Sequence, residues 1–501
     1  MKLNLREMKN ILVTLCLCTG ISNVSEAQNV LLINNATIVS PERDDARADQ
    51  NILIEDGRII KISTDAISVG ASHKVIDAAG KFLTPGIMDS HVHVSSVPGL
   101  GFPGEAKPEM YPDLLKVYFK QQPRSFLYHG VTQVLDPNPG MSKEYFVNAP
   151  LHPDYMRCEV ITAPGTFPFV EKPQEVAVKL FPYYVIEENP KELVDGQLSA
   201  SDRTPQKMVS EIAQSGASCV KLYFEDGYGE DSQWAMMDAK TLIEIDAAAK
   251  EHGLLVLAHA NELEMQKAAL DAGVDIIAHG MWNWAGANSE QGVPDKVAET
   301  LNRIMADNVG YMASQMIIEG LGKLMLDQSI NDPEVKKVVP AELIEWFKTD
   351  DAKWFREEVR LGFGSDISPE EVAEIFLYVI AKRGRRAMMH LYNSGYSLLL
   401  GSDFPGSQTF ANQPGLTSFR ELELMADAGV SLRDVMAAAT INNAKQFSID
   451  DDYGTVTEGK IANLLILNKN PFDDVKAWND IDKVILHGQE HDRDEFLAST
   501  N

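Results

Sequence analysis

A repeated strand-then-helix pattern constrains the fold of this chain more than any other feature. Apolar runs that suit buried parallel strands alternate with helical patterns such as MDAKTLIEIDAAAKEHG and ANELEMQKAALDAGV. The runs are GIMDSHVHV, VTQVLDP, CEVITAP, CVKLYF, LLVLAHA, DIIAHG, GYMASQM and SLLLGSD. Eight such units predict an α/β fold of the (β/α)8 TIM-barrel type, and the alternative is an open doubly wound sheet. We favour the barrel because polar residues follow many different strands, and a barrel gathers the ends of all its strands at one mouth.

Both ends of the chain carry short strands with alternating apolar residues and tight turns. Examples are NILIEDGRIIKI near the start and IANLLILN near the end. Neither end has enough strands to bury a core alone. We therefore predict one small β-sandwich from residues 28–84 and 446–501, beside a barrel over 85–445. The barrel contains more chain than its units need, which predicts a helical insertion at about 285–390 that covers the site.

The first 27 residues have the pattern of a signal peptide. Lys2, Arg6 and Lys9 form a positive region, an apolar run follows, and Ser25-Glu26-Ala27 offers small residues to a signal peptidase. The apolar run is too short to anchor the chain across a bilayer. We predict cleavage before Gln28 and export to the periplasm or the medium.

The composition of the chain excludes some classes of partner. Its 501 residues carry a formal net charge of −28, which argues against nucleic-acid binding because that needs a basic face. No later stretch is long and apolar enough for a membrane helix. We expect a small-molecule substrate, and the sequence leaves the oligomeric state open. Without the signal peptide two cysteines remain, Cys158 and Cys219, and we expect them to be buried small apolar residues.

The residues that carry chemistry follow the apolar runs. His91 and His93 lie two residues apart, so in a strand both imidazoles share one face. The whole set consists of His91, His93, Lys221, His259, His279 and Asp403. Imidazoles with a carboxylate bind zinc, and also manganese, iron, nickel or cobalt. A bound metal lowers the pKa of water from about 15.7 to near 7, and Asp403 would hold the metal and take the proton of that water.

Lys221 is the unusual member of this set. An ammonium group should not face a metal cation, because like charges repel and burial disfavours the charged form. Lys221 therefore either points elsewhere and forms a salt bridge, or is neutral and reacts with carbon dioxide to form a carbamate. Such a carbamate is anionic and has two oxygens able to bridge two metals. The residues alone leave both arrangements open.

Six motifs in this order resemble the metal-dependent amidohydrolase superfamily, in its imidazolonepropionase-like and Xaa-Pro dipeptidase-like branch. They are PGIMDSHVH, HGVTQVLD, VKLY, HANELEMQKAALDAGVDIIAHG, LLLGSDFP and GTVTEGKIANLLILNKNPFDD. Three positions depart from the superfamily pattern: Asn261 stands where a second histidine is common, Ala278 where a glutamate is common, and Asn463 where an aspartate is common.

The resemblance implies how the site is assembled. It implies a barrel flanked by a β-sandwich, with one or two divalent ions, most often zinc. His91 and His93 would bind the more buried ion and His259 and His279 the other. Asp403 would be both ligand and general base, and Lys221 would be carbamylated and bridge the two ions.

The substrate is predicted only by class. We expect metal-bound hydroxide to attack a C–N or C–O acyl bond of an amide, dipeptide, cyclic amide or lactone. Tyr223, Trp282, Trp284 and Arg386 are candidate substrate contacts, and the alternative for the tryptophans is packing in the core. Two other functions stay open: a metal-dependent lyase or dehydratase acting on a sugar acid or oligosaccharide, and an inactive exported binding protein.

Overall fold

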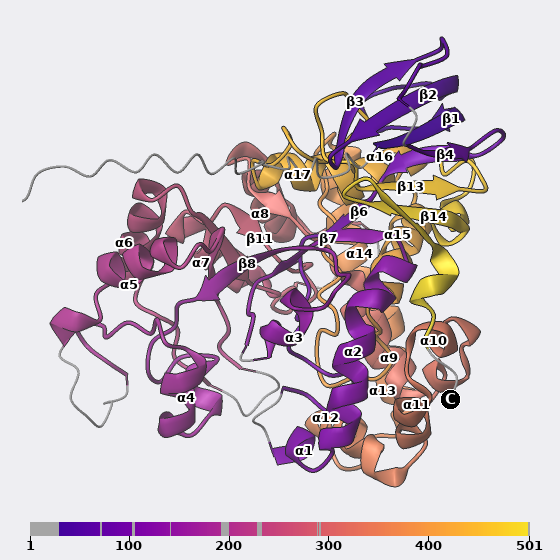
Figure 1. Ribbon diagram of the computed structural model, residues 1–501. Coiled ribbons are helices and arrows are strands. Elements are labelled where there is room, and N and C mark those ends of the chain that lie inside the picture. Colours follow the sequence, from indigo (N-terminus) through magenta and orange to yellow (C-terminus); the bar gives the residue numbers. More distant parts are fainter. Residues whose placement is uncertain are drawn as a thin grey trace, which may run out of the picture.

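The computed structural model (Figure 1) describes residues 30–498, except 71–72, 103–105, 141, 192–199, 228–232, 288 and 290–291. The predicted signal peptide, residues 1–27, lies outside the described residues. In the described part of the chain, none of the helices has the length and apolar character needed to cross a membrane.

Strands from the two ends of the chain form one sheet, at the upper right of Figure 1. Its strand order is β15-β14-β13-β5-β1-β2-β3, and β4 also pairs with β1. The strands are β1 Val30–Ile38, β2 Arg47–Glu55, β3 Arg58–Ser63, β4 Lys74–Asp77, β5 Phe82–Pro85, β13 Leu464–Leu467, β14 Ile481–Leu486 and β15 Gln489–Asp492. The two ends meet where β5 pairs antiparallel with β13, with Thr84 opposite Leu465. Each end therefore completes the sheet and the apolar core of the other.

The middle of the chain forms a second sheet of seven parallel strands in sequence order. They are β6 Ile87–Asp89, β7 Val131–Asp136, β8 Asp154–Val160, β9 Cys219–Tyr223, β10 Leu255–His259, β11 Ile276–Ile277 and β12 Gly310–Tyr311. The last predicted run, SLLLGSD, does not form a named strand. Leu399 nevertheless bridges Met312 in parallel, and the Leu400 carbonyl accepts a hydrogen bond of 3.1 Å from the Ser90 amide. Residues 399–400 thus lie between β12 and β6, and the fold is an α/β fold of the TIM-barrel type.

Helices surround this sheet, and most of them contribute buried apolar side chains to the core. Those of the first half are α1 Ala106–Glu109, α2 Pro112–Tyr128, α3 Lys143–Val147, α4 Gln174–Leu180, α5 Pro205–Gln214, α6 Ala239–Glu251, α7 Leu263–Ala272 and α8 Asp295–Ala306. Those of the second half are α9 Gln315–Met325, α10 Pro333–Val338, α11 Ala341–Phe347, α12 Trp354–Gly362, α13 Pro369–Glu374, α14 Ala381–Asn393, α15 Leu416–Ala428, α16 Leu432–Ala437 and α17 Asn443–Gln446. The predicted helical patterns correspond to α6 and α7.

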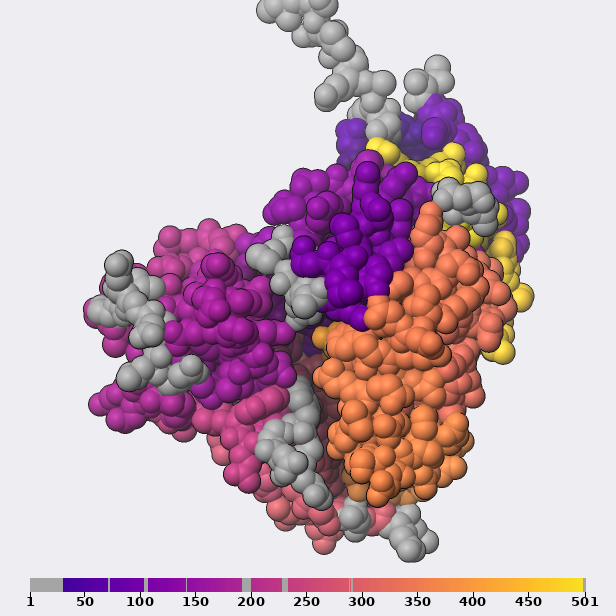
Figure 2. Space-filling view, turned by 90° about the horizontal axis from the view of Figure 1, so that it is seen from below, coloured from indigo at the N-terminus to yellow at the C-terminus, as the bar shows by residue number. Residues whose placement is uncertain are grey.

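The extra helices of the predicted insertion pack against the loop that follows His93. The indole N–H of Trp354 donates to the Gly99 carbonyl at 2.9 Å. Gly99 has a φ of +78°, and a Cβ there would lie 2.9 Å from the Trp346 ring, so the loop can approach this closely only with a glycine. These helices (orange) form the right-hand part of the lower face in Figure 2.

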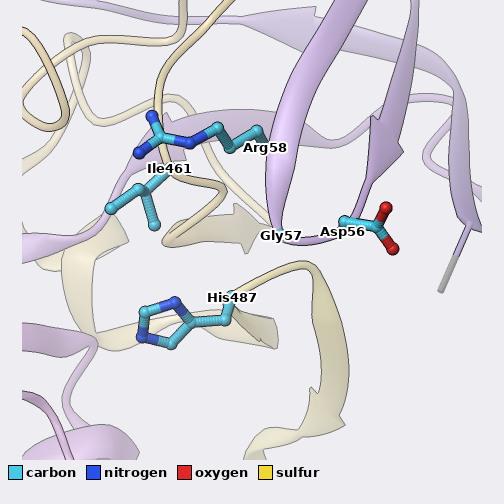
Figure 3. A pocket seen from close by; sticks show the side chains of 5 residues that line it. All are labelled: Asp56, Gly57, Arg58, Ile461 and His487. Atoms are coloured by element: carbon cyan, nitrogen blue, oxygen red, sulfur yellow. The ribbon is translucent and has the colours of Figure 1, made fainter. Parts of the chain in front are cut away.

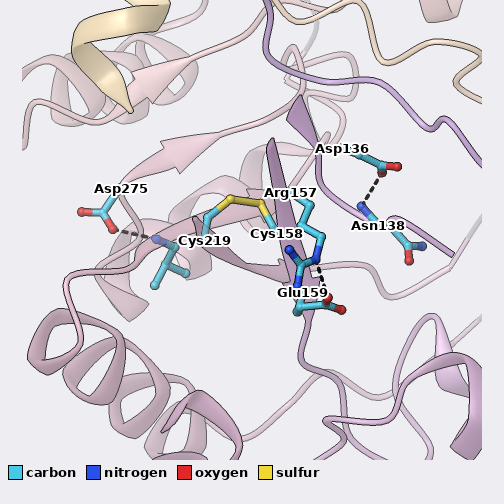
Figure 4. The surroundings of a disulfide bond; sticks show 8 residues. Asp136, Asn138, Arg157, Cys158, Glu159, Cys219 and Asp275 are labelled. Carbon is cyan, nitrogen blue, oxygen red and sulfur yellow. Dashed lines mark hydrogen bonds and ion pairs between the residues drawn. A yellow bond between two sulfur atoms is a disulfide. The ribbon is translucent and has the colours of Figure 1, made fainter. Parts of the chain in front are cut away.

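Cys158 and Cys219 are buried, as predicted, but they form a disulfide and are therefore not simple apolar side chains. They lie opposite each other on the neighbouring strands β8 and β9, in the buried core of the barrel (Figure 4). Strand register places their Cα atoms 4.3 Å apart. Because this register depends on how two strands 61 residues apart align, the spacing of the cysteines in the sequence did not reveal the pair.

Loss of this disulfide should lower the stability of the fold. We expect replacement of both Cys158 and Cys219 by alanine to reduce the free energy of unfolding by about 2–4 kcal/mol, because the bond closes a long loop in the unfolded chain. Denaturant unfolding of the variant, with reduced wild type as the matched comparison, measures the loss. Identical unfolding midpoints for oxidised wild type and the variant would show that the bond contributes nothing.

The hairpin turn between β14 and β15 connects the small sheet to the opposite, amino end of the barrel. The imidazole of His487 lies 2.7 Å from the carboxylate of Asp154, the first residue of β8. That carboxylate also accepts hydrogen bonds from Tyr453 and Asn463. A pocket beside His487 is lined by Asp56, Gly57, Arg58, Ile461 and His487 (Figure 3).

The contribution of His487 to stability should depend on pH. Its hydrogen bond to Asp154 raises the pKa of His487 above 6.5, so the stabilisation is complete below about pH 6.5 and is lost as pH rises through the folded-state pKa. Because the side chain is half exposed, we expect His487→Ala to lower the free energy of unfolding by only about 0.5–1 kcal/mol near pH 6, and by less near pH 9. Urea unfolding at both pH values measures this. His73→Ala is the control, because the ring of His73 contacts the Gly70 carbonyl instead; equal pH dependence of the two variants would contradict the assignment.

Candidate metal centre

Five of the six predicted ligands form one cluster at the carboxyl ends of the barrel strands. The Oδ1 atom of Asp403 lies 3.1 Å from Nε2 of His91 and 3.0 Å from Nε2 of His93. The Oδ2 atom of Asp403 lies 3.3 Å from Nδ1 of His279. The Nε2 atom of His279 is in turn 2.8 Å from Nδ1 of His259. The strand ends thus bring these residues within side-chain reach of one another, although they are far apart in the sequence.

The backbone at Asp403 shows how this side chain is directed into the cluster. Asp403 has a φ of +53°, in the left-handed region that aspartate tolerates better than most residues. The amide of His93 donates to the carbonyl of the next residue, Phe404, at 2.6 Å. The histidine segment and the aspartate segment are therefore adjacent at the backbone level.

Lys221, the sixth predicted ligand, is at the third position of β9 and 1% exposed. Its Nζ atom has no hydrogen-bond partner among the described residues. Burial lowers the pKa of Lys221 to about 7, and the neighbouring Asp403 opposes this only in part. A buried amine that is readily neutral and makes no hydrogen bond is the form that can react with an electrophile.

The protonation states in the cluster fit a cation. Burial holds the pKa of His91 and that of His279 well below the ordinary 6.5, so both rings are neutral near pH 7. Nδ1 of His91 faces the Ala278 carbonyl at 3.3 Å, which takes the single N–H of that ring and leaves a lone pair on Nε2 toward Asp403. Burial opposes ionisation of Asp403, but His91, His93 and Lys221 outweigh it, so the pKa of Asp403 is below its ordinary value.

One ligand atom each from His91, His93 and Asp403 lies within 4.8 Å of the others. Two imidazole nitrogens and a carboxylate oxygen that converge in this way match the donor set of a borderline divalent cation.

A second buried carboxylate, that of Asp89, connects the two segments that carry these ligands. Asp89 is completely buried, and its Oδ1 accepts from the amides of His91 at 3.2 Å and Ser402 at 3.0 Å. Its Oδ2 accepts from the Ser418 hydroxyl at 2.6 Å. Asp89 therefore fixes where His91 and the segment of Asp403 lie relative to each other.

Removal of this carboxylate should be costly. We expect Asp89→Ala to lower the free energy of unfolding by about 3 kcal/mol, because it leaves buried donors without an acceptor. Ser418→Ala, which removes one hydrogen bond, should cost about 1 kcal/mol. Thermal unfolding of the metal-free proteins compares the two variants. If the larger loss belonged to Ser418→Ala, Asp89 would not have the connecting role described here.

The sequence did not single out two further buried acids at this site, Asp136 and Glu225. Asp136 ends β7, and its Oδ1 atom is 3.8 Å from Nδ1 of His93. Burial raises the pKa of Asp136 to about 6, against the opposing effect of His93. Glu225 contacts His259 at 3.1 Å. Their positions at the ends of the runs VTQVLDP and CVKLYF were a usable signal, but their burial was not visible in the sequence.

The four predicted substrate contacts take different positions. The Tyr223 ring lies 5.3 Å from the His259 ring, and the Trp282 ring 5.5 Å from the His279 ring, so both border the cluster. Trp284 is 1% exposed and its indole N–H donates to the Met281 carbonyl, which is the core packing given as the alternative. Arg386, on α14, donates to the Ser289 carbonyl at 2.9 Å.

Comparison with known proteins identifies the family. The profile of the Amidohydrolase family matches residues 82–490, which is most of the chain. The chain belongs to the amidohydrolase family. The superfamily predicted from the six motifs is therefore confirmed, and solved structures of Xaa-Pro dipeptidase type are among the similar folds.

The curated relatives of this amidohydrolase match over short stretches. An L-hydantoinase of Paenarthrobacter aurescens is 41% identical over 64 residues, 13% of this chain and 13% of that protein. A dihydroorotase of Streptococcus pneumoniae serotype 4 is 39% identical over 66 residues, 13% and 14% of the two chains.

Similar solved structures cover almost the whole chain at low identity. A Xaa-Pro dipeptidase with bound methionine has a TM-score of 0.61 and 19% identity, and covers 93% of this chain and 100% of its own. The ochratoxinase of A. niger has a TM-score of 0.63 and 16% identity, covering 93% and 96%. At these identities the likeness establishes the fold.

Proposed function

We propose that this amidohydrolase is an exported, metal-dependent enzyme. It hydrolyses C–N or C–O acyl bonds of small molecules, and its main substrates are amides. The observation that carries the proposal is the convergence of His91, His93 and His279 on Asp403, beside the Nζ of Lys221, which has no hydrogen-bond partner among the described residues. The partial matches to two hydrolases, a hydantoinase and a dihydroorotase, support it. We also infer that residues 398–404 act as the eighth barrel strand and that the flanking sheet folds into a β-sandwich.

The donor set supports one or two divalent ions, of which zinc is the proposed metal. His91, His93 and Asp403 would hold one ion, and His259 and His279 the other. A carbamate on Lys221 would be the anionic ligand shared by the two, formed when the neutral amine adds to carbon dioxide and releases a proton. Such ions, when bound, lower the pKa of a coordinated water and polarise the acyl oxygen of the substrate.

The residues of the chain would carry the proton transfers and the binding of substrate. Asp403, whose low pKa keeps it ionised, is placed to accept the proton of the attacking water and to deliver it to the leaving nitrogen. Burial raises the pKa of Tyr223, so its hydroxyl stays protonated and is available as a donor to a substrate oxygen. The Trp282 ring offers an apolar wall beside His279.

A substrate screen tests the proposal. Purified protein loaded with zinc or manganese is incubated with amides, dipeptides, cyclic amides, lactones and uronate-containing oligosaccharides. We expect turnover of an amide or cyclic amide, and incorporation of oxygen-18 from labelled water into the acid product. A product formed without label would instead indicate a lyase or dehydratase, and binding of metal with no turnover at all would indicate a binding protein.

Export is proposed from the leader sequence. The Cys158–Cys219 disulfide supports it, because such bonds persist in oxidising compartments. Intact-mass analysis of protein expressed with its own leader should find a mature chain that begins at Gln28. A cytoplasmic product that retains Met1 would contradict export.

A further inference from the structure

Glu225 is a buried carboxylate near the cluster that no step above uses. It lies two residues after the end of β9 and is 2% exposed. Its Oε2 atom is 3.1 Å from Nε2 of His259 and accepts from the side-chain amide of Asn261 at 3.3 Å. Its Oε1 atom accepts from the backbone amide of Gly227 at 3.0 Å. Both oxygens are therefore held in place by donors on the chain.

A count of protons shows what this carboxylate does to His259. A neutral imidazole has one N–H. His259 and His279 together bring two. Glu225 accepts from Nε2 of His259, which leaves Nδ1 of His259 with a lone pair 2.8 Å from Nε2 of His279. Nε2 of His279 either donates its own N–H to that lone pair or, when a cation lies against both nitrogens, presents a lone pair to it as well.

We propose that Glu225 is a positioning residue for a second cation: it holds the proton of His259 on Nε2 and thereby directs the lone pair of Nδ1 toward His279. This inference rests on the proposed function, which places an ion at His259 and His279. Asn261 helps to hold Glu225 in place, because its side-chain amide donates to the same Glu225 oxygen that faces His259. Outer carboxylates of this kind fix the tautomer and the orientation of a metal-binding histidine.

The charges around Glu225 agree with a nearby cation. Asp226 follows it directly, and Glu262 is close enough that burial, Asp226 and Glu225 together raise its pKa. Like charges in one place destabilise each other, and a cation at His259 and His279 would offset that repulsion. The alternative is an N–H on Nε2 of His279, which would hydrogen-bond Nδ1 of His259 and make a second cation unnecessary.

Zinc titration of the full-length mature protein tests the proposal. The chain is titrated in zinc buffers, and bound zinc is counted after rapid desalting. We expect the wild type to bind two ions. Glu225→Gln should weaken the second ion by about 10–100-fold and leave the first unchanged. A glutamine side chain has a single uncharged oxygen to accept hydrogen bonds from donors that now bind two carboxylate oxygens.

Matched variants separate this effect from general loss of charge or of structure. Glu211→Gln removes the same charge at an exposed position on α5 and should leave both affinities unchanged. Retention of the first ion reports folding, because His91, His93 and Asp403 meet only in the folded barrel. Should Glu225→Gln fail to fold, Glu225→Asp keeps the charge at a shorter reach and should weaken the second ion less than tenfold.

The possible outcomes distinguish this inference from the proposed function. Two ions of unchanged affinity in Glu225→Gln, or a single ion in both proteins, would overturn the positioning role and leave the first cation in place. A wild type that binds no zinc would overturn the proposed function and this inference together. Selective loss of the second ion would support both.

Discussion

Asp403→Asn is expected to lower kcat/KM for the hydrolysed substrate by about 10³–10⁴-fold, the largest loss from any single substitution considered for this chain. Asparagine keeps the shape of the side chain but cannot accept the proton of the attacking water. It also removes the negative charge at the point where three imidazoles converge. The measurement is kcat/KM at saturating zinc, so that weakened metal binding does not count as lost proton transfer.

Asp427→Asn is the matched control, because Asp427 is an exposed acid on α15 and should tolerate the change. If Asp403→Asn regained full activity at high zinc, Asp403 would be a ligand only, and another group would carry the proton. If it kept activity within about tenfold under all conditions, the proposed general base would be wrong.

Lys221→Met should lower kcat/KM by about 10²–10⁴-fold. Loss of a residue that only orients a metal ligand costs about 10–100-fold in metal affinity. Loss of a ligand shared by two ions should weaken the binding of each ion at least as much. Methionine matches the length and apolar stem of lysine, so the buried position on β9 should accept it. Lys240→Met, at an exposed position on α6, is the control and should leave kcat/KM unchanged.

Two measurements show whether a carbamate accounts for this loss. Wild type prepared in carbon-13 bicarbonate should give a carbamate signal that Lys221→Met lacks. Lys221→Ala leaves a cavity, and acetate or propionate should restore part of its activity by supplying a carboxylate in place of the carbamate. Full wild-type activity after metal removal and reloading in buffer free of carbon dioxide would exclude the carbamate.

The sequence predicted the sheet order well because periodicity is a local property. Seven of the eight runs are the parallel strands β6 to β12. The eighth run has few of the regular contacts of a strand, and its backbone turns into a left-handed conformation at Asp403. Alternation of apolar residues carries no information about such a local change of direction.

The candidate ligands were predictable and their supporting residues were not. His91, His93, His259, His279 and Asp403 each follow an apolar run, so the ends of parallel strands were enough to bring them together. Asp89 and Glu225 stand out only by their burial and by their hydrogen bonds to other segments, which the assembled barrel creates. The same limit applies to Trp284, because its position in the sequence was compatible both with the rim of the site and with the core.

The most direct test of the central claim, that these strand ends hold catalytic cations, is X-ray diffraction from crystals of zinc-loaded protein, measured on both sides of the zinc absorption edge. We predict an anomalous peak within coordination distance of His91, His93 and Asp403, and a second between His259 and His279. The absence of any peak beside Asp403, or zinc bound only at some other place on the chain, would contradict the account.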